Sequence, residues 1–247
     1  MRLYEEPSLR VDGPDLLDQE VIRMVPEGVG SLVDLGCGTG AVVNHFFARG
    51  LRTLGVDISR LALSKVQGRT VVADVAAVPV EERFDVVVLS RVLEHLDALT
   101  FRGCLREAGR LASRYIIVAS PLRERLSLGQ TRCVWCGRLF HASNHLRRVD
   151  PGAAARALAP AFQWKELRTV GRTVRHYPAV LWMLRTTVLG IWPRDIARPC
   201  PFCGSVQAVH AEREYHALSS AIDRQALRWR RRRVRATHFV LLLERKV

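Results

Sequence analysis

The chain has 247 residues and carries 38 lysines and arginines against 24 acidic residues, which gives a formal net charge of +14. At 48% hydrophobic and 25% charged residues it has a globular composition, so a wholly disordered or collagen-like chain is excluded. Six cysteines are too few for a disulfide scaffold, and residues 1–7 contain no apolar segment of the kind found in a signal peptide. We expect a cytoplasmic globular protein whose charge suits an anionic partner such as nucleic acid, a phosphorylated substrate or an acidic membrane.

The first half of the chain alternates between short apolar runs and helical stretches. A polar segment comes first, with a short helix predicted around residues 15–25. Near-continuous apolar strands that alternate with helices form βαβ units, so the pattern predicts a doubly wound α/β sheet. The predicted strands are 31–35, 52–56, 70–73, 84–89 and 115–119, and the predicted helices are 41–49, 59–66 and 98–113.

The regular alternation ends after Ser120. A helix is predicted over 150–158, with Asp150 as its N-cap and Pro151 at its first position. Two further strands, near 164–170 and 237–243, complete a seven-stranded sheet. The predicted organisation is an N-terminal segment (1–30), a cofactor-binding core (31–120), an insertion (121–149), a return to the core (150–171), a second insertion (172–235) and a final core strand (236–247).

A glycine-rich loop, Gly36-Cys-Gly-Thr-Gly40, follows the first strand and opens a helix. Glycines allow a tight turn and a close approach of a ligand to the backbone, and the helix start beyond offers free N–H groups. The spacing is GxGxG, preceded by Asp34, whereas dinucleotide-binding loops use GxGxxG. Taken alone, the loop is also compatible with a simple strand-to-helix turn.

Acidic residues at the ends of the next two strands add to this signal. Asp57 ends the second strand and Asp74-Val75 ends the third, and the fourth strand is followed by Leu93-Glu-His-Leu96. In this order the segments resemble the class I S-adenosylmethionine-dependent methyltransferases over residues 30–120. The resemblance implies that the glycine loop holds the methionine end of the cofactor, the second acidic residue the ribose and the third segment the adenine. The residues concerned are Asp34, Gly36, Gly38, Gly40, Asp57, Asp74 and Val75.

Glu94 and His95 place a carboxylate beside an imidazole. Small-RNA 2′-O-methyltransferases use a Glu-x-x-Glu-His arrangement as metal ligands at this position, but this chain has Arg91 in place of the first glutamate. We favour a packing and orienting role near the cofactor over catalysis or metal binding. His95, His141 and His145 are the catalytic candidates, and the general base is not identified. For His141 and His145, a surface or metal-supporting position is an equal alternative.

Two CxxC pairs, each followed by glycine, are typical of zinc knuckles. Cys133 and Cys136 form the first pair and Cys200 and Cys203 the second. Each pair aims two thiolates at one ion, and two pairs complete a tetrahedron. We predict a structural Zn²⁺ that staples the two insertions together on the substrate face, with a redox pair or free thiols as the alternative.

The second insertion contains an apolar stretch at 179–192 and an arginine run at 228–235. The stretch is too short to span a bilayer and reads as a lid helix, or alternatively as a helix at the membrane interface. The arginine run is either a solvated face or a phosphate-binding patch.

The resemblance therefore implies a Rossmann-like seven-stranded methyltransferase with zinc-stapled insertions. We predict O- or N-methylation of a small-molecule or saccharide-type acceptor, anionic or lipid-linked, with peripheral membrane contact as an option and no transmembrane segment. The alternative is an RNA methyltransferase whose zinc element and arginines bind phosphates. A non-catalytic S-adenosylmethionine-binding protein is a third hypothesis, which the intact glycine loop disfavours.

Overall fold

The computed structural model describes residues 14–171, 180, 183–184, 186, 199–205 and 236–246, and the chain divides into two compact units. The core unit comprises residues 1–124, 147–171 and 236–247, and the cysteine unit comprises 125–146 and 172–235. The predicted arginine run lies outside the described residues, as does the predicted lid segment apart from four of its residues.

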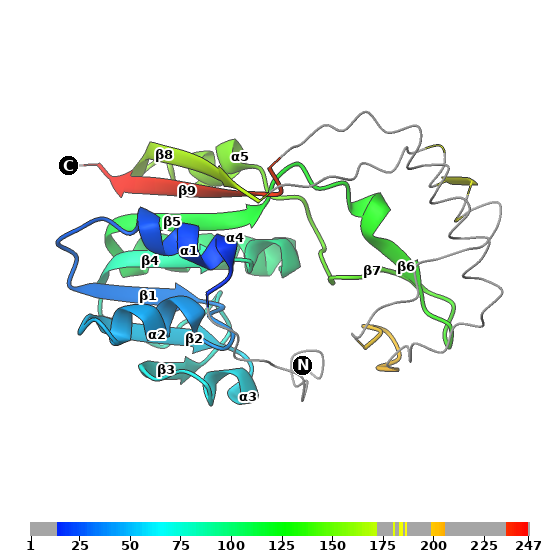
Figure 1. The fold of residues 1–247 in the computed structure, drawn as a ribbon, viewed down its shortest axis with the longest axis horizontal. Coiled ribbons are helices and arrows are strands. Elements are labelled where there is room, and N and C mark those ends of the chain that lie inside the picture. The colour runs from blue at the N-terminus through cyan, green and yellow to red at the C-terminus, as the bar shows by residue number, and fades with distance from the viewer. Residues whose placement is uncertain are drawn as a thin grey trace. The chain divides into compact units, whose positions relative to one another are not determined.

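A seven-stranded sheet forms the core unit, in the order β3-β2-β1-β4-β5-β9-β8 (Figure 1). The paired strands are parallel except at β9, which is antiparallel to both β5 and β8. Consequently β5 and β8 run in the same direction, as predicted for strands five and six. The bounds are β1 Ser31–Leu35, β2 Arg52–Asp57, β3 Arg69–Val72, β4 Phe84–Ser90, β5 Ala112–Pro121, β8 Phe162–Val170 and β9 His238–Arg245.

The α-helices of the core unit begin at polar caps, except α2, which begins after Gly40. Asp150 caps α5 with Pro151 at the first position, as predicted, and Asp97 caps α4 by accepting hydrogen bonds from Leu99 and Thr100. The helix bounds are α1 Leu16–Met24, α2 Ala41–Phe47, α3 Arg60–Leu63, the 3₁₀ turn η2 Leu93–His95, α4 Ala98–Leu111 and α5 Pro151–Leu158.

Helices α2, α3 and α4 all end earlier than predicted, α2 at Phe47. The α3 helix stops after one turn because the N–H groups of Lys65 and Val66 bond to carbonyls three residues back, which tightens the chain. The α4 helix ends at Leu111, and β5 starts at the next residue, Ala112, which is buried.

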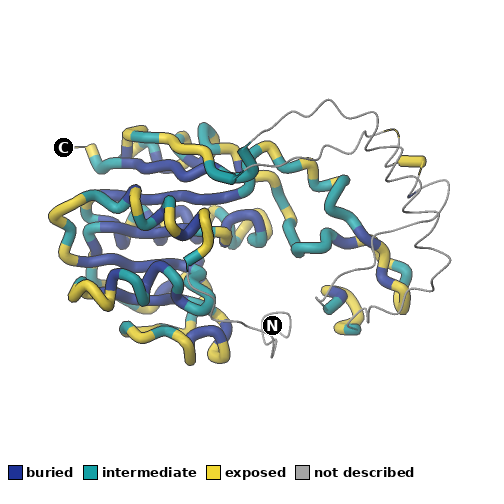
Figure 2. The backbone as a smooth tube through the Cα atoms, viewed as in Figure 1, coloured by how far each residue is buried: buried dark blue, intermediate teal, exposed yellow. Residues whose placement is uncertain are grey.

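Alternate residues of the strands pack into apolar clusters on opposite faces of the sheet, so Val33 of β1 belongs to one cluster and Leu32 to the other. The cluster that contains Val33 includes α4 and α5 side chains, such as Leu105 and Leu158. The Leu32 cluster includes side chains of α1 and α2. The five inner strands are accordingly the most deeply buried segments of the core unit, whereas the edge strands β3 and β8 are largely exposed (Figure 2).

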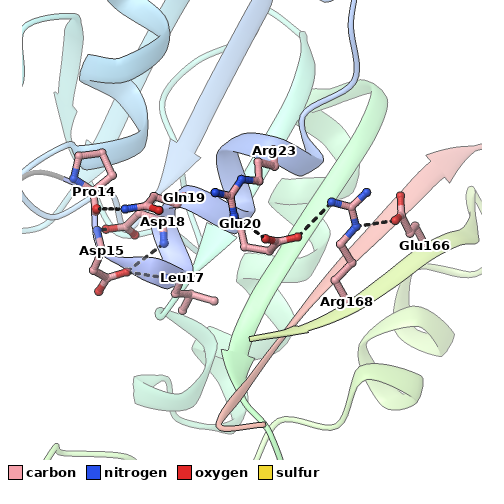
Figure 3. Close-up of polar contacts among 9 residues, drawn as sticks. All are labelled: Pro14, Asp15, Leu17, Asp18, Gln19, Glu20, Arg23, Glu166 and Arg168. Atoms are coloured by element: carbon pink, nitrogen blue, oxygen red, sulfur yellow. Dashed lines mark hydrogen bonds and ion pairs between the residues drawn. The ribbon is translucent and has the colours of Figure 1, made fainter. Parts of the chain in front are cut away.

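The N-terminal helix α1 is fixed by polar contacts at its start and at its middle (Figure 3). Asp15 and Asp18 form a reciprocal capping box at its start. At the middle of the helix Glu20 accepts a 3.0 Å hydrogen bond from Arg168 of β8, which also pairs with Glu166. These ion pairs tie α1 to the edge strand of the sheet.

The described part of the cysteine unit contains a short hairpin that the sequence did not predict. A 3₁₀ turn, η3 (Leu126–Gly129), leads into β6 (Gln130–Arg132), which pairs antiparallel with β7 (Leu139–His141). Strands of three residues are too short to show a period-two pattern, which explains why the sequence does not reveal them. Among the described residues of the chain, no helix is both long and apolar enough to cross a membrane.

Candidate functional site

The glycine loop between β1 and α2 has a left-handed backbone at three positions. Gly36, Gly38 and Gly40 have φ values of 79°, 54° and 82°. A Cβ at Gly36 would lie 2.6 Å from the side chain of Val92, so the loop packs directly against the segment that follows β4. At Gly38, by contrast, a Cβ would meet nothing within 4 Å. The loop is thus closed on one side and open at its centre.

Asp34, near the carboxyl end of β1, is a buried carboxyl group with an unsatisfied oxygen. Its side chain is 3% exposed, and its Oδ1 atom has no hydrogen-bond partner among the described residues. Burial, with the nearby negative charges of Asp18 and Asp57, raises the pKa of Asp34 to about 8, and Arg91 only partly opposes this. A positively charged ligand group at this site would therefore stabilise the ionised form of Asp34.

The second acidic residue, Asp57, connects the end of β2 to the glycine loop. Its Oδ2 accepts a hydrogen bond from the N–H of Gly38 at 2.9 Å, and its Oδ1 accepts one from Ser59 at 2.8 Å. Next to it the side chain of Ile58 is 44% exposed, which is unusual for a large apolar residue beside a polar loop. Sequence reasoning missed Ile58, because its neighbours give no sign of its exposure.

The third segment lies at the end of β3, beside β2. Asp74 is exposed and accepts a 2.8 Å hydrogen bond from the N–H of Ala76, whereas the side chain of Val75 is buried. Because β1, β2 and β3 are adjacent and parallel, their carboxyl ends meet at one edge of the sheet. The structure thus brings all seven predicted cofactor residues to this edge.

Arg91, which replaces the glutamate of the metal-binding pattern, is engaged by the start of α1. It has a left-handed φ of 54°, and its guanidinium pairs with both Asp15 and Asp18. These charges raise the pKa of Arg91 further despite its partial burial. Sequence analysis did not foresee this link, although the Asp15-x-x-Asp18 spacing of a capping box was visible.

The Glu94–His95 segment forms the 3₁₀ turn η2, beyond β4. Glu94 is 1% exposed and accepts a 2.8 Å hydrogen bond from the hydroxyl of Ser120 at the end of β5. The turn is also held by Arg147, whose Nε–H donates to the carbonyl of Leu96 at 2.8 Å and whose guanidinium lies 4.4 Å from the ring centroid of Phe101. The buried position of Glu94 agrees with the packing role that we favoured from the sequence.

The other two histidine candidates belong to the cysteine unit. The rings of His141 and His145 stack with centroids 4.7 Å apart and an interplanar angle of 12°. The Nδ1 atom of His141 accepts the N–H of Ser143 at 3.2 Å. Gly129 is needed here, because a Cβ would lie 1.9 Å from the Nε2 atom of His141.

The four cysteines of the two CxxC pairs converge in the cysteine unit. Their sulfurs all lie within 4.8 Å of one another, with 3.6 Å between Cys133 and Cys203 and 3.7 Å between Cys136 and Cys200. In a tetrahedral site with Zn–S bonds of about 2.3 Å the sulfurs stand about 3.8 Å apart. The spacing is therefore that of a four-thiolate metal site.

The two CxxC loops have the same backbone geometry. Gly137 and Gly204 both have φ of 72°, and each donates its N–H to the carbonyl of the first cysteine of its pair, at 3.0 and 2.9 Å. The first cysteines, Cys133 and Cys200, are buried, and the second ones are exposed. Both loops are therefore preformed knuckles that project their sulfurs toward a common point.

The pKa values of the thiols in this cluster differ. Hydrogen bonds from the hydroxyl and backbone of Ser205 lower the pKa of Cys203 to about 6. A backbone hydrogen bond at Arg138 acts in the same direction on Cys136, but burial and the neighbouring sulfurs outweigh it and raise the pKa of Cys136 to about 11. A divalent cation would favour the thiolate form of both.

Comparison with known proteins finds one family model and several solved structures that resemble this chain. Residues 33–114 match the family model of a methyltransferase domain. A S-adenosylmethionine-dependent methyltransferase from Archaeoglobus fulgidus is 17% identical over 92% of both chains, with a TM-score of 0.56. Another, from Mesorhizobium loti, is 16% identical over 93% of this chain and 98% of its own, with a TM-score of 0.52.

A third structure, the 1,6-didemethyltoxoflavin-N1-methyltransferase of Burkholderia thailandensis, is 14% identical over 94% of this chain and 77% of its own, with a TM-score of 0.50. At such identities the likeness shows the fold alone. The search of curated proteins finds no match. The family match over residues 33–114 indicates a methyltransferase domain, and the structural likeness confirms the predicted α/β architecture.

Proposed function

We propose that this methyltransferase binds S-adenosylmethionine at the carboxyl ends of β1, β2 and β3. The single observation that carries the assignment is the buried, unsatisfied Oδ1 of Asp34 beside a glycine loop that is open at Gly38. The residues present fit the cofactor, because an uncompensated carboxyl group suits its positively charged methionine end. Asp34 and the glycines would hold this end, Asp57 the ribose hydroxyls, and Asp74 with the Val75 N–H the adenine.

The bound cofactor would supply an electrophilic methyl group for in-line transfer to an acceptor oxygen or nitrogen, with S-adenosylhomocysteine as the leaving group. The chain's own residues contribute position and charge. Asp18 and Asp57 lie near the buried carboxyl group of Asp34, with Arg91 as the opposing cation. A cationic ligand group would be favoured over a neutral one of the same shape, because it would stabilise the ionised form of Asp34. The Asp57 carboxylate orients the centre of the loop through Gly38. Such positioning is a major source of rate enhancement in a two-reactant displacement.

For the cysteine unit we propose a structural Zn²⁺ held by Cys133, Cys136, Cys200 and Cys203. The matched knuckles and the 3.6–3.7 Å sulfur separations support it. Four thiolates leave no open position, so the ion would hold the unit's two segments together rather than take part in catalysis. A reducing compartment such as the cytoplasm would keep these cysteines from forming disulfides.

The proposed acceptor is a small molecule or saccharide, anionic or lipid-linked. Charge supports an anionic acceptor, because the cysteine unit carries 16 arginines against 4 acidic residues, whereas the core unit is close to neutral. A structural neighbour named for a small-molecule methylation agrees with this choice. The same charge favours RNA as the alternative acceptor, and a test of this alternative is given in the Discussion.

Binding of S-adenosylhomocysteine, measured by calorimetry, tests the cofactor assignment. Asp57→Ala is expected to weaken binding by about 1.5–3 kcal/mol for each charged hydrogen bond lost. Asp85→Ala is a matched control, since Asp85 also accepts two backbone N–H groups, from Gly30 and Ser31, but at the opposite end of β1. Equal affinity of the Asp57→Ala and Asp85→Ala proteins would refute the assignment.

A further inference from the structure

The cysteine unit has a large share of the exposed apolar side chains. Sixteen large apolar residues are exposed in the described part of the chain, and eight of them belong to this unit, which contributes far fewer described residues than the core. The eight are Val134, Trp135, Leu139, Leu146, Val180, Met183, Leu184 and Phe202. Trp135 is 74% exposed, and the knuckle segments that carry Trp135 and Phe202 are visibly exposed in Figure 2.

Metal binding does not require these residues to be apolar. Val134 and Trp135 are the middle residues of the first CxxC loop, and Phe202 occupies the position in the second loop that Trp135 has in the first. Their side chains are more than half exposed to solvent, where a polar residue would be equally compatible with the knuckle. A tryptophan that is three-quarters exposed gains nothing for folding, so its apolar surface is available for a partner.

Arginines are interleaved with the exposed apolar residues. The guanidinium of Arg138 lies 5.0 Å from the ring centroid of Phe202, and Arg132 donates to the carbonyl of Gly137 at 2.9 Å. The excess of arginine over acidic residues gives the cysteine unit a net charge of +12, while the core unit has 22 basic and 20 acidic residues. The unit that carries these exposed apolar side chains therefore also carries +12 of the chain's net charge of +14.

We propose that the cysteine unit docks on an anionic membrane surface, with the tips of the knuckles inserted at the interface. Six of the eight exposed apolar side chains are aliphatic or methionine. Such side chains gain free energy by leaving water for the acyl boundary, whereas stacking on nucleic-acid bases uses aromatic rings. Arginines place their charge among anionic headgroups, and their guanidinium groups also pack on aromatic rings, as that of Arg138 does on Phe202. This combination favours a membrane over RNA.

Flotation of the full-length, zinc-loaded protein with lipid vesicles tests the proposal. The two vesicle types are phosphatidylcholine alone and a mixture in which about a third of the lipid is phosphatidylglycerol. We expect binding to the mixed vesicles only, weakened by added salt. Trp135→Ser is expected to lower the partition coefficient roughly tenfold. Leu99→Ser is the matched control, because Leu99 is 77% exposed on α4 of the core unit and its loss should leave vesicle binding unchanged.

Zinc content measured on each variant separates loss of the surface from loss of the fold. If the Trp135→Ser protein loses its zinc, the Phe202→Ser variant, which changes the other knuckle, is used in its place. Failure to bind either vesicle, or binding that survives both substitutions, would overturn the proposal. If the protein instead binds a single-stranded RNA oligonucleotide and no vesicles, and the same variants lose this RNA binding, the proposal would be overturned in favour of nucleic acid. None of these outcomes depends on methyl transfer.

Discussion

The core unit and the cysteine unit are stabilised by different means. The core unit has a seven-stranded sheet with an apolar cluster on each face. The apolar cluster described in the cysteine unit contains only Cys133, Phe140 and Cys200, two of which are metal-ligand candidates. Among the described residues of this unit, a cluster of this size offsets little of the entropy of ordering the chain. Hydrophobic burial therefore accounts for the core unit, whereas in the described part of the cysteine unit a bound ion would have to contribute.

The largest expected effect is that of losing the ion. Structural zinc contributes about 10–16 kcal/mol of apparent binding free energy, which here would be folding energy of the cysteine unit. Cys200→Ser should therefore abolish the one equivalent of zinc expected by elemental analysis and expose residues 172–235 to proteolysis, while the core unit stays resistant. Cys104→Ala, at a buried cysteine of α4 that is no ligand, should retain the metal. Native protein that contains no zinc and has four freely alkylated thiols would contradict the proposal.

A smaller effect is expected in the core unit, from Asp34. The folded pKa of about 8 lies above the ordinary value of 3.8, so its contribution to stability is full below pH 3.8 and is lost as pH rises through about 8. At neutral pH the loss amounts to at most about 4 kcal/mol. The side chain of the Asp34→Asn variant cannot ionise. From pH 5 to pH 8 the cofactor-free variant should therefore lose less free energy of unfolding than the parent. Urea unfolding of both proteins at the two pH values measures this. Parallel losses in parent and variant would show that Asp34 does not titrate in this way.

The smallest effect concerns the basic charge of the cysteine unit. A small-molecule acceptor makes one or two ionic contacts, so methyl transfer should depend only weakly on salt. An RNA acceptor would give a log–log slope near −0.7 for each phosphate contact on a single strand. Replacing Arg230–Arg233 by Gln should leave transfer to a small acceptor nearly unchanged. RNA methylation that disappears with these arginines would replace the proposed acceptor and leave the fold and cofactor assignment intact.

The two units also differ in how far the sequence predicts them. The seven-stranded α/β sheet of the core is predicted by apolar runs that alternate with helices, and the glycine loop and Asp57 lie at the carboxyl ends of its strands. These features depend on local sequence patterns. The ion pairs of Arg91 with Asp15 and Asp18 were not predictable, because they join segments more than seventy residues apart.

Within the cysteine unit, the CxxC spacing predicts two knuckles that converge on one point. It does not reveal the hairpin of β6 and β7, whose strands are three residues long, or the stacking of His141 on His145. Ring stacking depends on side-chain rotamers and on the space left by Gly129, neither of which leaves a repeating pattern in the sequence.

The central claim is that the core unit binds the cofactor by itself, while the cysteine unit depends on its ion. Calorimetric titration of S-adenosylhomocysteine into the full-length protein, before and after zinc is removed with a chelator, tests this most directly. The account predicts that elemental analysis shows the loss of one zinc while the affinity for S-adenosylhomocysteine changes by less than about threefold, a difference below 1 kcal/mol. Loss of cofactor binding together with the zinc would contradict it.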